Sequence, residues 1–418
     1  MTKPMKIRLR LSLVLLVLAS NWAHAQLLPN VNGLIPTAVA RPLIEQNPSV
    51  AAARAGLEAA RQQAGILDKS PHEWTAKAMG QRRSIQSGQN YGEWSLGLER
   101  TLRLASKGMG DRSLGLAIVA EFQARYGEAL HESARELLAH WLDWLGAERT
   151  RGLAADNLQA VQENLLVVEK RVRAGDASRL DANLARAELA EQRRAENDAR
   201  TLAGAASARL SARFPGFSRA DTTLPSSAAL AADEAALRER IMAESDELKI
   251  VEANLLKATA QAERERAERR PDPTFGVHVT SEAGGRERIL GVSISVPLPG
   301  GVRDLRNAKA LAEVDVASNL VALKKRQLEA EIAGALVTAR GNHESLQMAQ
   351  EGMRAMQDNA RLVQRAYSLG EGDLQALLLA RRQASSVAAS ALQAQMAALK
   401  SYYGLLVDAH LVWDLERE

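Results

Sequence analysis

The chain has 418 residues, with 54 lysine and arginine residues against 50 aspartate and glutamate residues, and it contains no cysteine. The lack of cysteine excludes disulfides, thiolate metal sites and lipid attachment to a cysteine. Aromatic residues make up only 4% of the chain, a composition that favours thin layers of helices over a thick globular core.

Residues 1–25 have the features of a secretory signal peptide. Basic residues precede a short apolar run over 11–19, and Ala23-His24-Ala25 has the small residues of a cleavage site. The run is too short to cross a membrane as a helix. Because this leader holds four basic and no acidic residues, residues 26–418 carry 50 of each. That balance gives no reason to expect a nucleic-acid partner.

Two pairs of β-strands are predicted from the alternation of apolar and polar residues. The first pair covers about 74–83 and 93–104, and the second about 274–282 and 289–298. One face of these strands is apolar and the other is small or polar, which suits a sheet with lipid on one side. The residues predicted to contact lipid are Trp94, Leu96, Leu98, Leu290, Val292, Ile294 and Val296. The alternative is two ordinary amphipathic hairpins packed on the helices of a soluble α+β protein.

A very long helix is predicted after each strand pair, over about 106–174 and 302–369. Both intervals lack proline and are rich in alanine, leucine, glutamate and arginine, which favours helix. A narrow apolar stripe, as at Val161, Leu165 and Val168, predicts that the helices pack side by side as in a coiled coil. Each helix is expected to be about 100 Å long.

The chain is predicted to contain one structural unit twice, over about 40–225 and 231–418. A shift of about 195 residues aligns Gly175 with Gly370, and "RVRAGDASRLDANLARAEL" with "AYSLGEGDLQALLLARRQA". Each copy then has a helix, a strand pair, a very long helix, a glycine-containing turn and a returning helix.

Four strands from one chain are too few to close a barrel, and open strand edges are not tolerated in lipid. The predicted fold class is therefore mainly α with membrane β: an internally duplicated protomer of long helices that contributes four strands to a shared trimeric β-barrel. Three copies supply about 12 strands, enough to surround a water-filled pore. Candidates to line that pore are Glu99, Arg103 and Glu282.

These features resemble the TolC-like outer-membrane efflux family over essentially all of residues 26–418. The two helical turns, "RVRAGDASRLD" and "AYSLGEGDL", carry this resemblance, whereas "PHEWTAKA", "LERTLRL" and "VSISVPLPGG" look most like the outer-membrane component of cobalt–zinc–cadmium heavy-metal efflux systems. The resemblance implies a homotrimeric conduit in the outer membrane, whose β-barrel continues into a long periplasmic α-barrel formed by the helices. It also implies a periplasmic adaptor protein and an inner-membrane pump of the resistance–nodulation–division (RND) type as partners. The implied role is a passive exit duct for cations of the Co, Zn, Cd and Ni class.

The resemblance further implies roles for the two helical turns. In the family these turns contact the adaptor, and the matching residues here are Arg171, Gly175, Asp176, Ala177, Ser178, Gly370, Glu371, Gly372 and Asp373. A tyrosine and an aspartate that link neighbouring helices in the closed state match Tyr367 and Asp181. The acidic ring of better-known members has no match, because Ala376 and Leu379 stand at its positions. An acidic constriction would have to come from Asp181, Glu371 or Asp373.

No catalytic, cofactor or metal site is predicted. The histidines of residues 26–418 form no HxH or HxxxH pair; they are His72, His131, His140, His278, His343 and His410. The sequence has no nucleophile motif and no phosphate-binding glycine loop. An exported enzyme therefore has no support.

Two alternatives stay open at this point. Within the family, the chain could form a channel for drugs or for a protein exported by type I secretion, since the inner-membrane pump selects the substrate. From another class, it could be a soluble periplasmic coiled-coil scaffold, which would not need detergent for extraction.

Overall fold

The structure is a computed structural model that describes residues 33–86, 88–218, 223–227, 229 and 234–413. The predicted signal peptide lies outside the described residues, as does the predicted start of the second repeat at residue 231.

The elements follow the same order in the two halves of the chain. The first half contains α1 (Thr37–Glu45), α2 (Pro48–Asp68), β1 (Trp74–Arg83), β2 (Tyr91–Thr101), α3 (Ala105–Ala174) and α4 (Arg179–Arg213). The second contains α5 (Glu234–Glu244), α6 (Asp246–Glu268), β3 (Thr274–Glu282), a short 3₁₀ turn (Ala283–Gly285), β4 (Glu287–Ser295), α7 (Gly301–Leu369) and α8 (Leu374–Asp408). The matching order agrees with a duplicated protomer.

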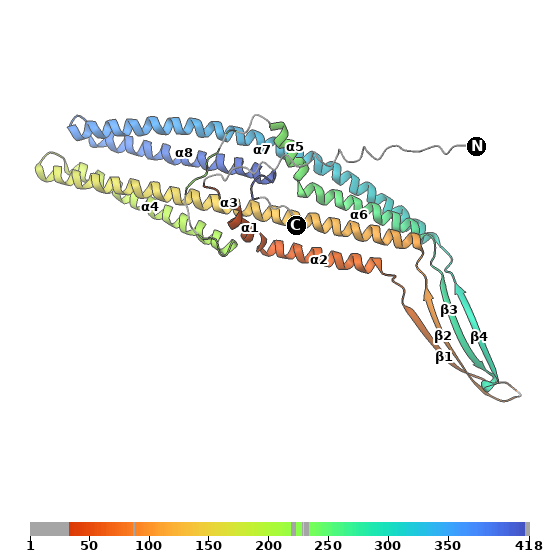
Figure 1. The fold of residues 1–418 in the computed structure, drawn as a ribbon. Coiled ribbons are helices and arrows are strands. Elements are labelled where there is room, and N and C mark those ends of the chain that lie inside the picture. Colours follow the sequence, from red (N-terminus) through yellow and green to blue (C-terminus); the bar gives the residue numbers. More distant parts are fainter. Residues whose placement is uncertain (1–32, 87, 219–222, 228, 230–233, 414–418) are drawn as a thin grey trace, which may run out of the picture.

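The long helices form a rod, with the sheet projecting from one end (Figure 1). Helices α3 and α7 have 70 and 69 residues, so each is about 105 Å long. Each packs along its returning helix, α4 or α8, and α3 also packs on α2, α6 and α8. At the end of the rod away from the sheet, α3 turns into α4 and α7 turns into α8 (Figure 1). None of the described helices has a stretch that is both long and apolar enough to cross a membrane.

The largest hydrophobic core lies in the middle of the rod. There α1, α3, the end of α4 and the end of α8 bury large side chains, among them Trp144, Leu137, Phe214 and Tyr403. The indole N–H of Trp413 donates to the backbone carbonyl of Ile35 at 2.7 Å. The segment after α8 is therefore fixed to the start of the described chain.

The predicted fold class is confirmed in its secondary structure: the protein is mainly helical, with a single four-stranded antiparallel sheet among the described residues. The strand ends differ from the predicted ranges. Strand β4 ends at Ser295, because Pro297 and Pro299 have no N–H to donate to a neighbouring strand. Val296, predicted to contact lipid, therefore lies just outside the strand.

Strand β2 ends at Thr101 rather than at residue 104. The backbone N–H of Leu104 donates to the carboxylate of Asp272 at 3.0 Å, and α3 begins one residue later. A side chain thus replaces a strand partner at this point, and the alternation of faces ends there.

Candidate functional site

The four strands form one sheet in the order β1-β2-β3-β4, with every neighbouring pair antiparallel. Pairing between β2 and β3 joins the two hairpins, so the two halves of the chain share one sheet. Strands β1 and β4 each have one edge without a strand partner among the described residues.

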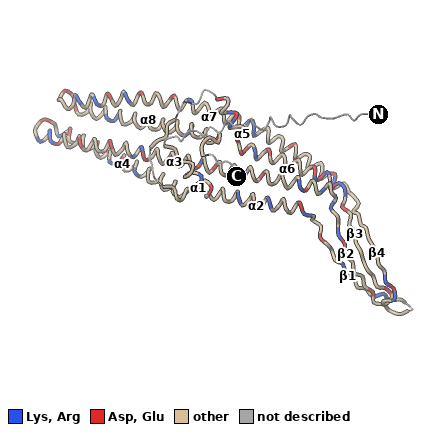
Figure 2. Tube along the Cα trace, viewed as in Figure 1, with Lys and Arg blue, Asp and Glu red and all other residues tan. Residues whose placement is uncertain are grey.

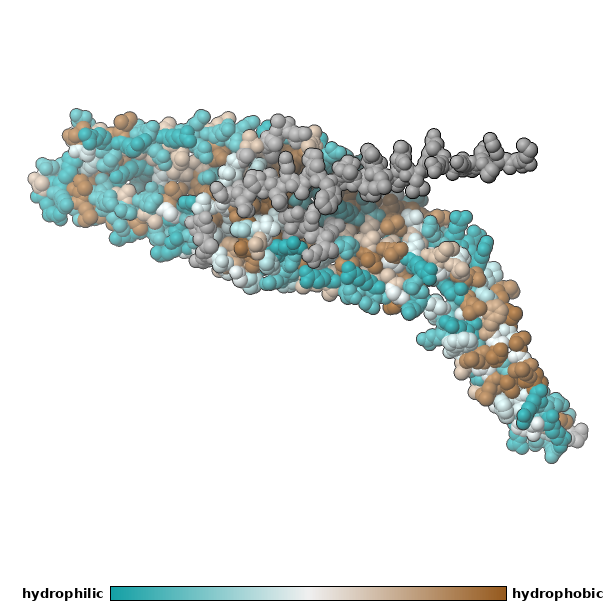
Figure 3. Space-filling model, viewed as in Figure 1, coloured by the Kyte–Doolittle hydropathy of each residue, from teal (hydrophilic) through white to brown (hydrophobic). Residues whose placement is uncertain are grey.

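One face of the sheet is an exposed apolar surface. The register places Leu96 beside Val279 and Val279 beside Leu290, and the next row in the same direction contains Leu98, Val277 and Val292. Val292 is 81% exposed and Leu290 is 80% exposed. Trp94 and Ile294 lie on this face as well, and Figure 3 shows the hydrophobic surface over the strands. An apolar area this continuous is unusual on a surface that faces water.

The opposite face of the sheet is polar. It carries ion pairs between Lys77 and Glu99 at 2.6 Å and between Arg83 and Glu282 at 3.1 Å, and Thr280 donates a hydrogen bond to Ser95 at 3.0 Å. Charged residues gather toward the two ends of the strands, while the middle of the sheet has few (Figure 2). Glu99 and Glu282 share this face, where the sequence predicted pore-lining residues.

Arg103 does not line this face, contrary to the prediction. Because β2 ends at Thr101, its side chain is only 11% exposed and pairs with Asp111 at 2.7 Å and with Asp272 at 3.3 Å. Lys107 is almost fully buried beside it and pairs with Glu268 and Asp272. We call these five residues the junction cluster; they join the start of α3, the end of α6 and the entry to β3.

The junction cluster makes the stability of the protein sensitive to acid. Burial alone would raise the pKa of Asp272, but hydrogen bonds from the Leu104 N–H and from Lys107 hold that pKa below its ordinary value of 3.8. Burial would also raise the pKa of Glu268, but hydrogen bonds from Lys107 and Arg103 hold that pKa below its ordinary value of 4.5. A carboxylate with a lowered pKa in the folded state stabilises that state above its unfolded pKa and loses this contribution as the pH falls through its folded pKa.

We therefore expect the melting temperature in detergent to fall as the pH drops from about 5 to 3. A K107M variant, which lacks one of the groups that lower both pKa values, should show a shallower fall.

The far end of the rod consists of two turns of the same type. The N–H of Gly175 donates to the carbonyl of Val172 at 3.2 Å, and the N–H of Asp176 donates to the carbonyl of Arg171 at 2.8 Å. This Schellman arrangement recurs at Gly370 and Glu371, which donate to Tyr367 and Ala366. Both glycines have positive φ, +87° and +82°. Ser178 and Asp373 then cap the returning helices α4 and α8.

The residues predicted to contact an adaptor thus occupy one end of the molecule. Gly175, Asp176, Ser178, Gly370, Glu371 and Asp373 are exposed, while Arg171, Ala177 and Gly372 are partly buried. The guanidinium of Arg171 lies 5.1 Å from the centre of the Tyr367 ring, so a cation–π contact joins the two turns.

Replacing Gly370 with alanine should weaken this end locally. A Cβ there meets no neighbour, so the cost is the left-handed backbone alone, about 1 kcal/mol. We expect amide hydrogen exchange around residues 366–371 to become about fivefold faster. The control is G341A in the exposed interior of α7, where a Cβ also meets nothing and alanine should stabilise the helix by about 0.5–1 kcal/mol. Equal exchange rates in G370A and the unmodified protein would contradict the assigned turn.

The predicted gate pair is not in direct contact within one chain. The carboxylate of Asp181 accepts from the N–H and the hydroxyl of Ser178 at 2.9 and 2.8 Å, as part of the cap on α4. The Tyr367 side chain is buried with Val168, Leu374 and other apolar residues. No hydrogen bond joins Asp181 to Tyr367 in the described part of the chain.

The structure brings together one set of metal-ligand residues that sequence spacing could not reveal. Within the described residues, a single group of three or more such side chains is close enough to hold an ion: His131, Asp246 and His410. These residues come from three distant parts of the chain, so no short motif connects them.

Comparisons with known proteins agree with this architecture. Residues 39–213 match the family described as "Outer membrane efflux protein". No curated protein matches the chain by sequence. The CmeC outer-membrane channel of Campylobacter jejuni aligns with 90% of this chain and 85% of its own, at a TM-score of 0.72 and 14% identity.

Two further solved structures give the same result. The outer-membrane protein VceC of Vibrio cholerae aligns with 90% of this chain and 95% of its own, at a TM-score of 0.70 and 15% identity. The open state of the MtrE channel of Neisseria gonorrhoeae aligns with 91% of this chain and 90% of its own, at a TM-score of 0.68 and 20% identity. At identities this low, the structural likeness shows the fold alone. The first half of the chain also carries the sequence pattern of outer membrane efflux proteins, a family of transport proteins, which agrees with the prediction that the chain is not an enzyme.

Proposed function

We propose that this chain is one protomer of a homotrimeric outer-membrane duct, through which an RND-type efflux pump releases heavy-metal cations. The observation that carries the proposal is the exposed apolar face of a four-stranded sheet at one end of a helical rod about 105 Å long. The open edges of β1 and β4 support assembly with further copies, because unpaired backbone groups are costly in lipid.

The proposal also gives the orientation of the molecule across the cell envelope. The apolar face of the sheet lies in the outer membrane, and its polar face, with Glu99 and Glu282, lines the pore. The rod crosses the periplasm, and its far turns contact the adaptor protein through residues such as Gly175, Glu371 and Asp373. Three copies of these acidic turns around one axis favour cations over anions. The family resemblance assigns Asp181 and Tyr367, at the same end, to a link between neighbouring helices in the closed state; this role requires Asp181 to leave its cap on α4.

The heavy-metal substrate rests on the likeness of "PHEWTAKA", "LERTLRL" and "VSISVPLPGG" to cobalt–zinc–cadmium efflux components. The experiment compares growth of the host with and without the gene in zinc, cobalt, cadmium, nickel and several hydrophobic drugs. We expect loss of the gene to sensitise cells to divalent metals alone, with recovery when the gene is returned. Sensitisation to drugs alone would make the chain a multidrug channel, and extraction without detergent would favour a periplasmic scaffold.

A further inference from the structure

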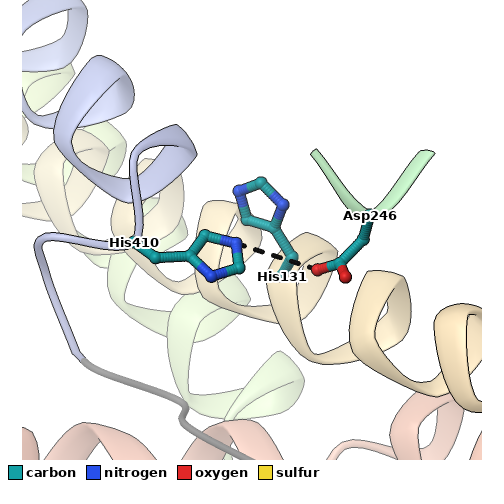
Figure 4. Close-up of side chains that lie close together, drawn as sticks. All are labelled: His131, Asp246 and His410. Atoms are coloured by element: carbon teal, nitrogen blue, oxygen red, sulfur yellow. Dashed lines mark ion pairs between the residues drawn. The ribbon is translucent and has the colours of Figure 1, made fainter. Parts of the chain in front are cut away.

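Three elements in the middle of the rod place potential metal ligands side by side (Figure 4). His131 lies on α3, Asp246 is the first residue of α6, and His410 follows the end of α8. One ligand atom from each lies within 4.8 Å of the others. The two imidazole rings meet edge to face, with their centres 5.0 Å apart, and Nε2 of His410 is 3.7 Å from Oδ2 of Asp246.

Three of the four histidine nitrogens in this group are buried without a hydrogen-bond partner among the described residues. The His131 side chain is only 6% exposed, and neither of its ring nitrogens has a hydrogen-bond partner among the described residues. Its Nε2 is 3.5 Å from the Asp408 carboxylate, an ion-pair distance rather than a hydrogen bond. Nε2 of His410 is also buried without a hydrogen-bond partner in the described chain. Buried polar atoms normally have partners, so these nitrogens point to a ligand.

The backbone at His410 gives a second, independent indication. Helix α8 ends in the same Schellman arrangement as α3 and α7: the N–H of His410 donates to Val407, and that of Leu411 donates to Leu406. In the other two turns the left-handed position holds glycine, but here His410 adopts it, with a φ of 53°. Histidine is less suited than glycine to this conformation. A strained residue of this kind often serves a function, and here the turn directs an imidazole toward His131 and Asp246.

The surrounding charges favour a bound cation. Three carboxylates, Glu128, Glu244 and Asp408, lie around the group beside Asp246 itself, opposed by three cations, Arg135, Arg240 and Lys249. Burial and the neighbouring His131 lower the pKa of His410. Lys249 lies 3.8 Å from Oδ1 of Asp246, whereas the other oxygen, Oδ2, faces His410.

We propose that His131, Asp246 and His410 bind one divalent transition-metal cation of the zinc class. Two imidazole nitrogens and one carboxylate oxygen are typical ligands for such ions. Tetrahedral coordination needs the ligand atoms about 3.3 Å apart, so the side chains must move inward slightly. A cavity of about 170 Å³ is lined by His131 and Asp246, together with Glu128 and Arg135 but not His410, and it gives room for a fourth ligand. The ion clamps the end of α8 to α3 and to the start of α6, and this role does not depend on the proposed efflux function.

The test uses the full-length protein without a histidine tag, purified in detergent and stripped of metal. Zinc is titrated against a competing chromophoric chelator, and cobalt is added separately to record its visible absorption spectrum. We expect one zinc ion per chain, a cobalt spectrum typical of four-coordinate nitrogen and oxygen ligation, and a melting temperature that rises with zinc.

Variant H410G removes the ligand but places glycine at a position whose backbone favours it, so the fold should persist. We expect H410G and H131Q to lose at least about tenfold in zinc affinity and to melt at the same temperature with or without zinc. The control is H140Q, which changes a histidine on α3 outside the group and should bind like the unmodified protein. Equal zinc affinity in H410G, H131Q and the unmodified protein, or no stoichiometric binding by the unmodified protein, would overturn the proposal.

Discussion

Replacing Lys107 with methionine is expected to destabilise the folded protein by about 3–5 kcal/mol. The Lys107 side chain is only 1% exposed, and its ammonium lies 2.8 Å from Glu268 and 3.0 Å from Asp272. Methionine keeps much of the volume but removes the charge. Arg103 still pairs with both Glu268 and Asp272, but a single arginine then faces two carboxylates and one negative charge is left without compensation. The cost of such a charge in a largely buried site exceeds the value of an ordinary surface pair.

The measurement is thermal unfolding in detergent at pH 7, followed by circular dichroism. The matched control is K309M on α7, where the lysine is 76% exposed and pairs with Glu313 one turn away; such a pair contributes less than about 0.5 kcal/mol. K107M should melt several degrees below both the unmodified protein and K309M. If the two lysine variants have the same melting temperature, the junction cluster does not hold the sheet to the helices.

The repeating parts of this fold are predictable from sequence because local chemistry decides them. Gly175 and Gly370 each follow a long run without proline, and each ends its helix in the conformation that glycine favours. The alternation of Leu96 and Leu98 with smaller or polar residues gives the apolar face of β2 directly. These features depend on neighbours a few residues away, so a single sequence contains the information.

The ends of the sheet are less predictable because they depend on distant partners. Period-two alternation continues from Leu102 to Leu104, and from the sequence it assigns Arg103 to the pore. In the structure Asp272 accepts the N–H of Leu104, 168 residues away, and draws Arg103 into the junction cluster. Nothing near Leu104 in the sequence indicates this hydrogen bond.

The group of His131, Asp246 and His410 is unpredictable for the same reason, because it depends on distant parts of the chain. Sequence spacing tests only ligands that share a helix or a turn, and His131 and His410 share neither. They meet because α8 returns along α3 and because the chain breaks between α5 and α6, where Ser245 caps the new helix by accepting from the N–H of Leu248. A positive φ at a histidine is also invisible in the sequence, since glycine is the usual sign of that conformation.

Replacing Val292 with arginine is expected to prevent stable insertion of the protein in the outer membrane. Val292 lies near the middle of β4 on the apolar face, between residues that point the same way, Leu290 and Ile294. An arginine facing lipid near the middle of the bilayer costs about 2–4 kcal/mol per chain. In the proposed trimer this cost arises three times.

The control is S293R, one residue along the same strand. Ser293 is exposed and pairs with Gly276 on the polar face, so an arginine there would face the water of the proposed pore. The measurement is the amount of each protein in outer-membrane fractions that require detergent for extraction, beside the growth of the same cells in zinc and cadmium. We expect V292R to be scarce in that fraction and to leave cells metal-sensitive, whereas S293R assembles and protects them. Arginines at two adjacent residues differ this much in cost only when one of them faces hydrocarbon and the other does not. Equal assembly of both variants would therefore show that the apolar face does not contact lipid.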